Sequence, residues 1–118
     1  MKSGTPQRLV VTTNTGDHYI PLDKLVCIKS KKGRCIMYYI NGQQQVETLT
    51  STRTMNYYYH QAEKLLLPVH RNACVNPQYV SALLSSQKIK FSVAGVDAVL
   101  VSHRMLRKVR AALRKSAS

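Results

Sequence analysis

Acidic residues are scarce in this chain: five Asp and Glu stand against eighteen Lys and Arg, which gives a formal net charge of +13. Solubility alone requires a much smaller net charge. A compact domain this basic usually meets nucleic acid or an acidic membrane surface. Because the sequence has neither a lipidation motif nor a long basic amphipathic anchor, it favours nucleic acid.

Long apolar runs and paired cysteine motifs are also missing. No apolar run approaches the roughly 20 residues of a membrane span, and residues 1–9 contain no apolar signal-peptide segment. We therefore expect a cytoplasmic protein that does not bind membranes. Three cysteines without a CxxC pair fit a reducing compartment. Cys27 and Cys35 flank a turn-like segment, where a disulfide is an alternative to the buried thiols that we expect.

What the sequence contains is enough apolar material for one packed domain. Its hydrophobic content is 44% over 118 residues. We predict a single domain at 7–115, a flexible arm at 1–6 and a tail at 116–118. The predicted fold class is mainly β, with antiparallel sheets of short strands, one small helix (about 52–66) and a C-terminal helix (102–115). The expected strands cover residues 7–13, 18–21, 23–29, 35–40, 43–50, 79–84, 88–93 and 98–101.

Both helices follow from the spacing of apolar residues. Apolar positions recur at helical spacing between 52 and 66, and Thr50 to Thr52 offers an N-cap. In the C-terminal segment, Leu106, Val109 and Leu113 form an apolar seam, and basic residues occupy the other faces. Each helix is therefore expected to pack one side on the core.

The first basic cluster is KSKKGR, Lys29 to Arg34, in which four of six residues are cationic. It lies between two predicted strands, so it should form a hairpin tip or loop. A solvated turn would explain it, but so dense a cluster in so basic a chain favours contact with phosphates.

A second group of polar residues lies within LPVHRNACVN, residues 67–76. Apolar and polar residues alternate roughly along it, so a short element can place its apolar side on the core. His70, Arg71 and Asn72 would then point outward. They are either local backbone partners or a surface suited to a polyanion.

The third group opens the C-terminal helix, for which Ser102 is the expected cap. Basic residues in the last turn suit the helix dipole, but Arg104 lies near the start, where the dipole disfavours a cation. A cation placed against a local preference indicates a role outside folding.

In order and spacing, these motifs resemble the LytTR domain, the DNA-binding domain of many bacterial response regulators. The segment LPVHRNACVNPQYVSAL is similar to the family pattern of Phe, any residue, Arg-Ile-His-Arg-Ser, two residues, Val-Asn and an isoleucine-centred strand. VLVSHR at 99–104 is similar to Val-Ser-Arg-Arg, and LVCIK at 25–29 to Ile-x-Tyr-Ile-Glu. The resemblance runs from about Asp17 to Leu113. Asn72 replaces the family's Ser, and His103 replaces the first Arg of the pair.

The resemblance implies an all-β core of short antiparallel sheets with a small helix, whose loops at one edge enter two successive major grooves. Such domains recognise direct repeats in double-stranded DNA and activate or repress transcription. It implies base contacts by Arg104, by Arg71 or its neighbours, and by Lys32 or Arg34. The residues expected to bind DNA are Lys31, Lys32, Arg34, His70, Arg71, Asn72, His103, Arg104, Arg107 and Lys108.

Other functions stay open at this point. The main alternative is an RNA-binding or ribosome-associated basic β-domain, although Phe91 is the only Phe available for base stacking. A Cys–His enzyme built on His70 and Cys74 has no orienting carboxylate nearby, and we expect no catalytic, cofactor or metal site. A protein-interaction role for 52–66 is compatible with DNA binding by a homodimer or tandem monomers. A chain of 118 residues is either a stand-alone regulator or part of a longer protein.

Overall fold

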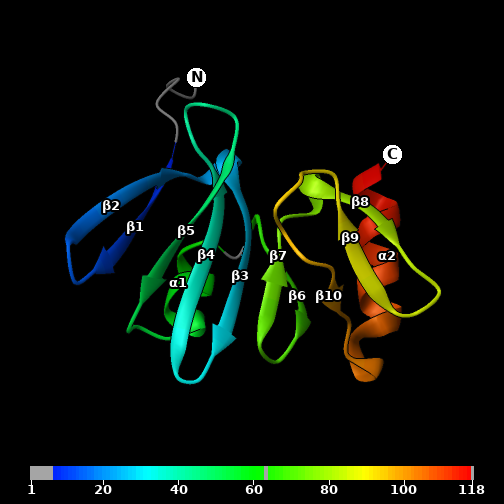
Figure 1. Ribbon diagram of the computed structural model, residues 1–118. Coiled ribbons are helices and arrows are strands. Elements are labelled where there is room, and N and C mark those ends of the chain that lie inside the picture. The colour runs from blue at the N-terminus through cyan, green and yellow to red at the C-terminus, as the bar shows by residue number, and fades with distance from the viewer. Residues whose placement is uncertain (1–6, 63, 118) are drawn as a thin grey trace, which may run out of the picture.

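A computed structural model describes residues 7–62 and 64–117 and confirms the predicted mainly β fold (Figure 1). Within these residues, ten strands form three antiparallel sheets. The strands are β1 (Arg8–Thr13), β2 (Gly16–Pro21), β3 (Leu25–Lys31), β4 (Arg34–Ile40), β5 (Val46–Ser51), β6 (Leu67–His70), β7 (Ala73–Val75), β8 (Val80–Leu83), β9 (Lys88–Phe91) and β10 (Val99–Leu100). The helices are α1 (Met55–Gln61) and α2 (Leu106–Ala117), with the short turns η1 (Leu22–Lys24), η2 (Pro77–Tyr79) and η3 (His103–Met105).

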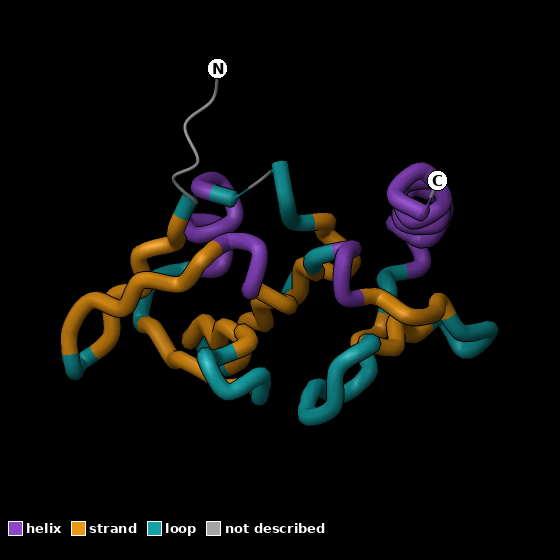
Figure 2. The backbone as a smooth tube through the Cα atoms, turned by 90° about the horizontal axis from the view of Figure 1, so that it is seen from above, coloured by secondary structure: helices purple, strands orange, loops and turns teal. Residues whose placement is uncertain are grey.

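The central sheet has five strands in the order β5-β4-β3-β7-β6. The β1–β2 hairpin and α1 lie on one side of it, and the three-stranded sheet β10-β9-β8 with α2 lies on the other (Figures 1 and 2). None of the described helices is long and apolar enough to span a membrane. The arm predicted at residues 1–6 lies outside the described part of the chain.

Strand β3 is shared between two hydrophobic cores. Leu25 and Ile28 pack in the core beneath β1, β2 and α1, whereas Val26 and Cys27 pack in the core beneath β8, β9 and α2. All four side chains are fully buried. A strand that is covered on both faces needs apolar residues at successive positions, which explains why LVCI at 25–28 is apolar throughout.

Helix α1 is shorter than the predicted helix and begins later. Its N-cap is Thr54, whose hydroxyl accepts a hydrogen bond from the Tyr57 N–H at 3.2 Å. Ser51, one of the expected caps, instead ends β5, where its buried hydroxyl lies 2.7 Å from the hydroxyl of Tyr58. Ser51, which was expected to cap the helix, therefore belongs to the preceding strand.

Asn41-Gly42 is typical of a tight two-residue turn between the predicted strands 35–40 and 43–50, but the connection between β4 and β5 is longer. Five residues, 41–45, join the two strands. The side-chain oxygen of Asn41 accepts hydrogen bonds from the Gln43 and Gln45 N–H groups at 2.8 and 3.0 Å. Gln44, with φ of 64°, takes the left-handed conformation that the motif had suggested for Gly42.

The three cysteines are free and buried, as expected. Cys27 pairs with Tyr38 across the β3–β4 ladder and lies in a different core from Cys35, so the two sulfurs do not face each other. Burial raises the pKa of Cys27, Cys35 and Cys74 to about 12 in each case. These thiols are therefore protonated at neutral pH.

Candidate nucleic-acid interface

The β3–β4 turn, the β6–β7 turn and η3 lie along the lower edge of the molecule in Figure 1. Two backbone hydrogen bonds tie this edge together. The Ser30 N–H donates to the Asn72 carbonyl, and the Ser102 N–H donates to the Val69 carbonyl, both at 2.8 Å. Segments far apart in the sequence are thus fixed side by side. We call this surface the basic edge, defined by the ten predicted residues Lys31, Lys32, Arg34, His70, Arg71, Asn72, His103, Arg104, Arg107 and Lys108.

The first part of the basic edge is a hairpin tip, one of the two forms predicted for residues 29–34, and it is tighter than that range. Only Lys32 and Gly33 form the turn, and their φ values of 51° and 76° are both left-handed. Two consecutive left-handed residues match the twist of antiparallel strands, which is why β3 and β4 extend so far. Lys31 and Arg34 pair directly across the ladder.

The four cations of KSKKGR differ in exposure. The ammonium nitrogen of Lys29 lies 4.8 Å from the ring centroid of Tyr38, and its side chain is half-buried. Lys31, Lys32 and Arg34 are exposed. The hairpin therefore presents three cations at its tip, and Lys29 packs on the sheet behind them.

The stretch 67–76 is a β-hairpin, not the single short element that the alternation suggested. Arg71 and Asn72 form its exposed turn, and the residues that follow in β7 are buried. Nδ1 of His70 accepts a hydrogen bond from the Asn72 N–H at 3.1 Å. With Nδ1 used as an acceptor, the neutral ring carries its proton on Nε2, which is then free to donate.

The third part of the basic edge is the 3-10 turn η3, which places Arg104 before α2. Ser102 makes no side-chain capping bond, contrary to the predicted cap, and α2 runs on to Ala117. Arg107 and Lys108 occupy the first turn of α2, which has no acidic residue. The helix dipole disfavours cations there. Their position therefore has no explanation in helix stability.

A hollow of about 250 Å³ joins the first two parts of the basic edge. Lys31, His70 and Asn72 line it together with Leu100. Leu100 is 51% exposed, although both of its neighbours are buried. No sequence pattern marks Leu100 as exposed, because Val99, Leu100 and Val101 are all apolar.

None of the five acidic residues of the sequence lies in these three segments. Asp17 accepts a hydrogen bond from the Thr12 hydroxyl in the β1–β2 hairpin. Glu47 accepts one from the Tyr39 hydroxyl at 2.7 Å. Partial burial, followed by this bond, raises the pKa of Tyr39 to about 12. The positive charge of the basic edge is therefore not neutralised from within its own segments.

The geometry gives little support to the enzyme alternative. Desolvation holds Cys74 as a neutral thiol, which is a poor nucleophile, so a Cys–His pair with His70 lacks its reactive partner. Among the described residues, no three His, Cys, Asp or Glu side chains gather in a way that suits a metal ion.

A family model and a solved structure match this chain. The family model described as the LytTr DNA-binding domain matches residues 16–114. The fold is similar to the LytTr DNA-binding domain of a protein described as a methyl-accepting/DNA response regulator from Bacillus cereus, with a TM-score of 0.70 and 17% identity. That similarity covers 93% of this chain and 98% of the other, and at this identity it shows the fold alone. No curated protein sequence matches.

Proposed function

Because this chain belongs to the LytTR family of DNA-binding domains, found in transcription regulators, we propose that it reads specific double-stranded DNA sequences through the basic edge. The observation that carries the proposal is the joining of three separate basic segments by the Ser30–Asn72 and Ser102–Val69 backbone bonds. Fixed spacing between side chains is what reading a base sequence requires, because bases present their donors and acceptors at fixed intervals.

Base reading falls to the residues with directional hydrogen-bonding groups. Arg104 and Arg71 can each donate two bonds to guanine O6 and N7, and Asn72 can pair with adenine. His70 offers Nε2, and Leu100 supplies an apolar surface suited to a thymine methyl group. These side chains would enter successive major grooves.

The remaining cations of the basic edge would supply most of the affinity for DNA. Phosphate contacts position a protein without carrying sequence information. This group comprises Lys31, Lys32, Arg34, His103, Arg107 and Lys108. Two copies on a direct repeat, as a homodimer or as tandem monomers, would double the number of bases read and the number of phosphates neutralised.

Titration of duplex DNA and duplex RNA of equal length, over a series of salt concentrations, tests the proposal. About six to ten phosphate contacts predict a steep loss of DNA affinity with salt. The major groove of RNA is too deep and narrow for these side chains, so RNA should bind more weakly. Arg8→Ala, which removes an exposed cation from β1, is the control for net charge. Equal affinity for both duplexes would favour the RNA-binding alternative.

A further inference from the structure

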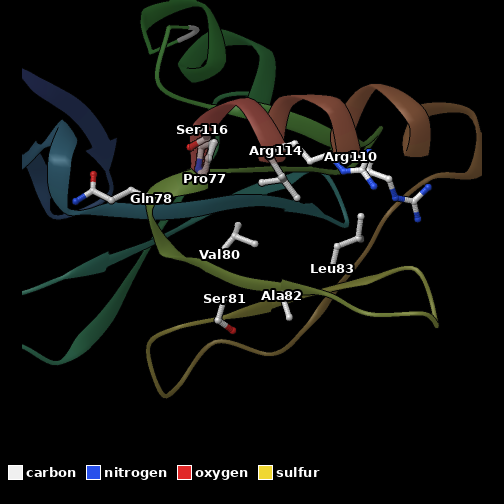
Figure 3. A pocket seen from close by; sticks show the side chains of 10 residues that line it. Pro77, Gln78, Val80, Ser81, Ala82, Leu83, Arg110, Arg114 and Ser116 are labelled. Carbon is white, nitrogen blue, oxygen red and sulfur yellow. The ribbon is translucent and has the colours of Figure 1, made fainter. Parts of the chain in front are cut away.

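A groove between α2 and β8 lies apart from the residues assigned to DNA. It has a volume of about 480 Å³. Figure 3 shows Val80 and Leu83 pointing from β8 toward α2, and Leu113 of α2 lines the same space. These three side chains are only partly buried against the core. The groove therefore offers an apolar floor within the usual size range of a binding pocket.

Two arginines flank this floor. Arg110 and Arg114 line the groove, are exposed, and lie four residues apart, which places them on one side of α2. No acidic residue occurs in the sequence of η2, β8 or α2, so these elements supply no carboxylate to either guanidinium. The groove thus combines apolar surface with two adjacent positive charges.

The first turn of α2 belongs to the basic edge, and the later turns border this groove. The helix starts beside η3 and runs away from that edge (Figure 1). At 1.5 Å per residue, Arg114 lies roughly 10 Å along the helix axis from Arg107. Arg110 and Arg114 also line a hollow with His103, Arg104 and Arg107, so the two arginines border both surfaces. The apolar floor of Val80, Leu83 and Leu113 lines only the groove.

We propose that this groove binds an acidic amphipathic segment of a partner protein. Its carboxylates would pair with Arg110 and Arg114, and an apolar side chain would contact Val80, Leu83 and Leu113. Arginine beside a buried apolar centre is typical of protein interfaces. A phosphate backbone would gain little from the apolar floor, so protein fits this groove better than nucleic acid.

A single stretch of a second copy of this domain does not supply the partner segment, because no two acids of this sequence lie three or four positions apart. The two nearest acids in this sequence, Asp17 and Asp23, are six positions apart, and the other three are further from any acid. Two arginines spaced i, i+4 call for two carboxylates at a similar spacing. The proposal goes beyond DNA reading, and neither depends on the other.

A random library of displayed peptides, about 15 residues long and thus able to form an amphipathic helix, tests this proposal when selected on the intact protein. We expect the enriched peptides to carry acidic and large apolar residues together. Synthetic copies should bind wild type and lose at least about tenfold in affinity on the double variant Arg110→Glu/Arg114→Glu. Replacing their acids by Gln should give a similar loss.

The double variant Arg107→Glu/Lys108→Glu is the matched control, because it reverses the same charge on the same helix. It should retain peptide binding and lose affinity for a duplex of about two helical turns. Arg110→Glu/Arg114→Glu should lose peptide binding and a smaller part of the DNA affinity, because both arginines also border the basic edge. Thermal unfolding verifies that both variants fold. Three results would each overturn the proposal. The selected peptides could lack acids, their binding could be independent of Arg110 and Arg114, or the two variants could lose equal affinity for DNA. DNA binding by wild type is scored separately, so either proposal can fail alone.

Discussion

Lys31 and Arg34 lie directly opposite each other across the β3–β4 hairpin, so two cations occupy one cross-strand pair. Like charges in this position destabilise a sheet. The intervening Lys32 has φ of 51°, a conformation that asparagine or glycine adopts more readily. The like-charge pair and the left-handed Lys32 thus both lower the stability of the hairpin. That cost is understandable if the three cations meet phosphates.

Arg34→Glu should therefore stabilise the fold and weaken DNA binding. An opposite-charge pair with Lys31 is worth about 0.2–1 kcal/mol in the free energy of unfolding, and the variant also removes a like-charge pair. Urea denaturation and DNA titration measure the two effects. Lower stability with unchanged DNA affinity would show that the tip has no electrostatic role.

Arg104→Ala should lower discrimination between DNA sites by about 1–3 kcal/mol, because a bidentate contact to guanine is lost. The double variant Lys31→Ala/Lys32→Ala should instead weaken all DNA alike and reduce the salt dependence. Titration of a preferred and a scrambled duplex separates the two outcomes. Unchanged site preference in Arg104→Ala would show that this arginine does not read bases.

Asn72 and Asn76 are predicted to have separable roles. The buried Asn76 amide donates to the Leu25 carbonyl at 2.8 Å, and its oxygen accepts from the Gln78 N–H at 3.0 Å. Asn76→Ala leaves both groups without their partner and should cost about 2–4 kcal/mol of stability.

Asn72→Ala is the comparison, since Asn72 is exposed in a turn. It should change stability by less than about 0.5 kcal/mol and lower DNA affinity. Chemical denaturation of both variants at one pH is sufficient. Equal destabilisation would mean that the Asn72 side chain supports the hairpin.

Stability should fall at alkaline pH because of the buried thiols. The pKa of each is about 12 in the folded protein, against an ordinary value of 9.0 for a thiol. The folded state therefore holds protons that the unfolded state releases between these values. This contribution is complete below about pH 9 and is lost as pH rises toward 12.

At pH 10 the loss should be about 1–2 kcal/mol for each thiol. Denaturation at pH 7.5 and pH 10 measures it, and Cys27→Ala should reduce the difference between the two. A free energy of unfolding that stays constant up to pH 10 would contradict the burial described for these residues.

Much of the fold could be predicted, because the spacing of apolar residues within each element indicates which of its sides is buried. The apolar run of β3 and the seam of Leu106, Val109 and Leu113 both predicted buried surfaces correctly. Boundaries were less predictable, since Ser51 is as good a cap by type as Thr54. Pairing with β4 keeps Ser51 in β5, and such a contact is not visible in local sequence.

The basic segments could be selected from charge and resemblance, but their arrangement could not. Ser30 and Asn72 are brought together by the pairing of β3 with β7, and Ser102 meets Val69 only after the third sheet has packed. Leu100 was missed for a related reason, because its exposure depends on which face of a two-residue strand the core covers.

Selection of bound duplexes from a random DNA pool, at physiological salt, tests the central claim most directly. We predict enrichment of one motif by wild type, recurring as a direct repeat, with relaxed preference at particular positions when Arg104→Ala is selected in parallel. Failure to enrich any motif, with binding that disappears as salt rises, would contradict specific reading and leave the basic edge as a non-specific polyanion surface.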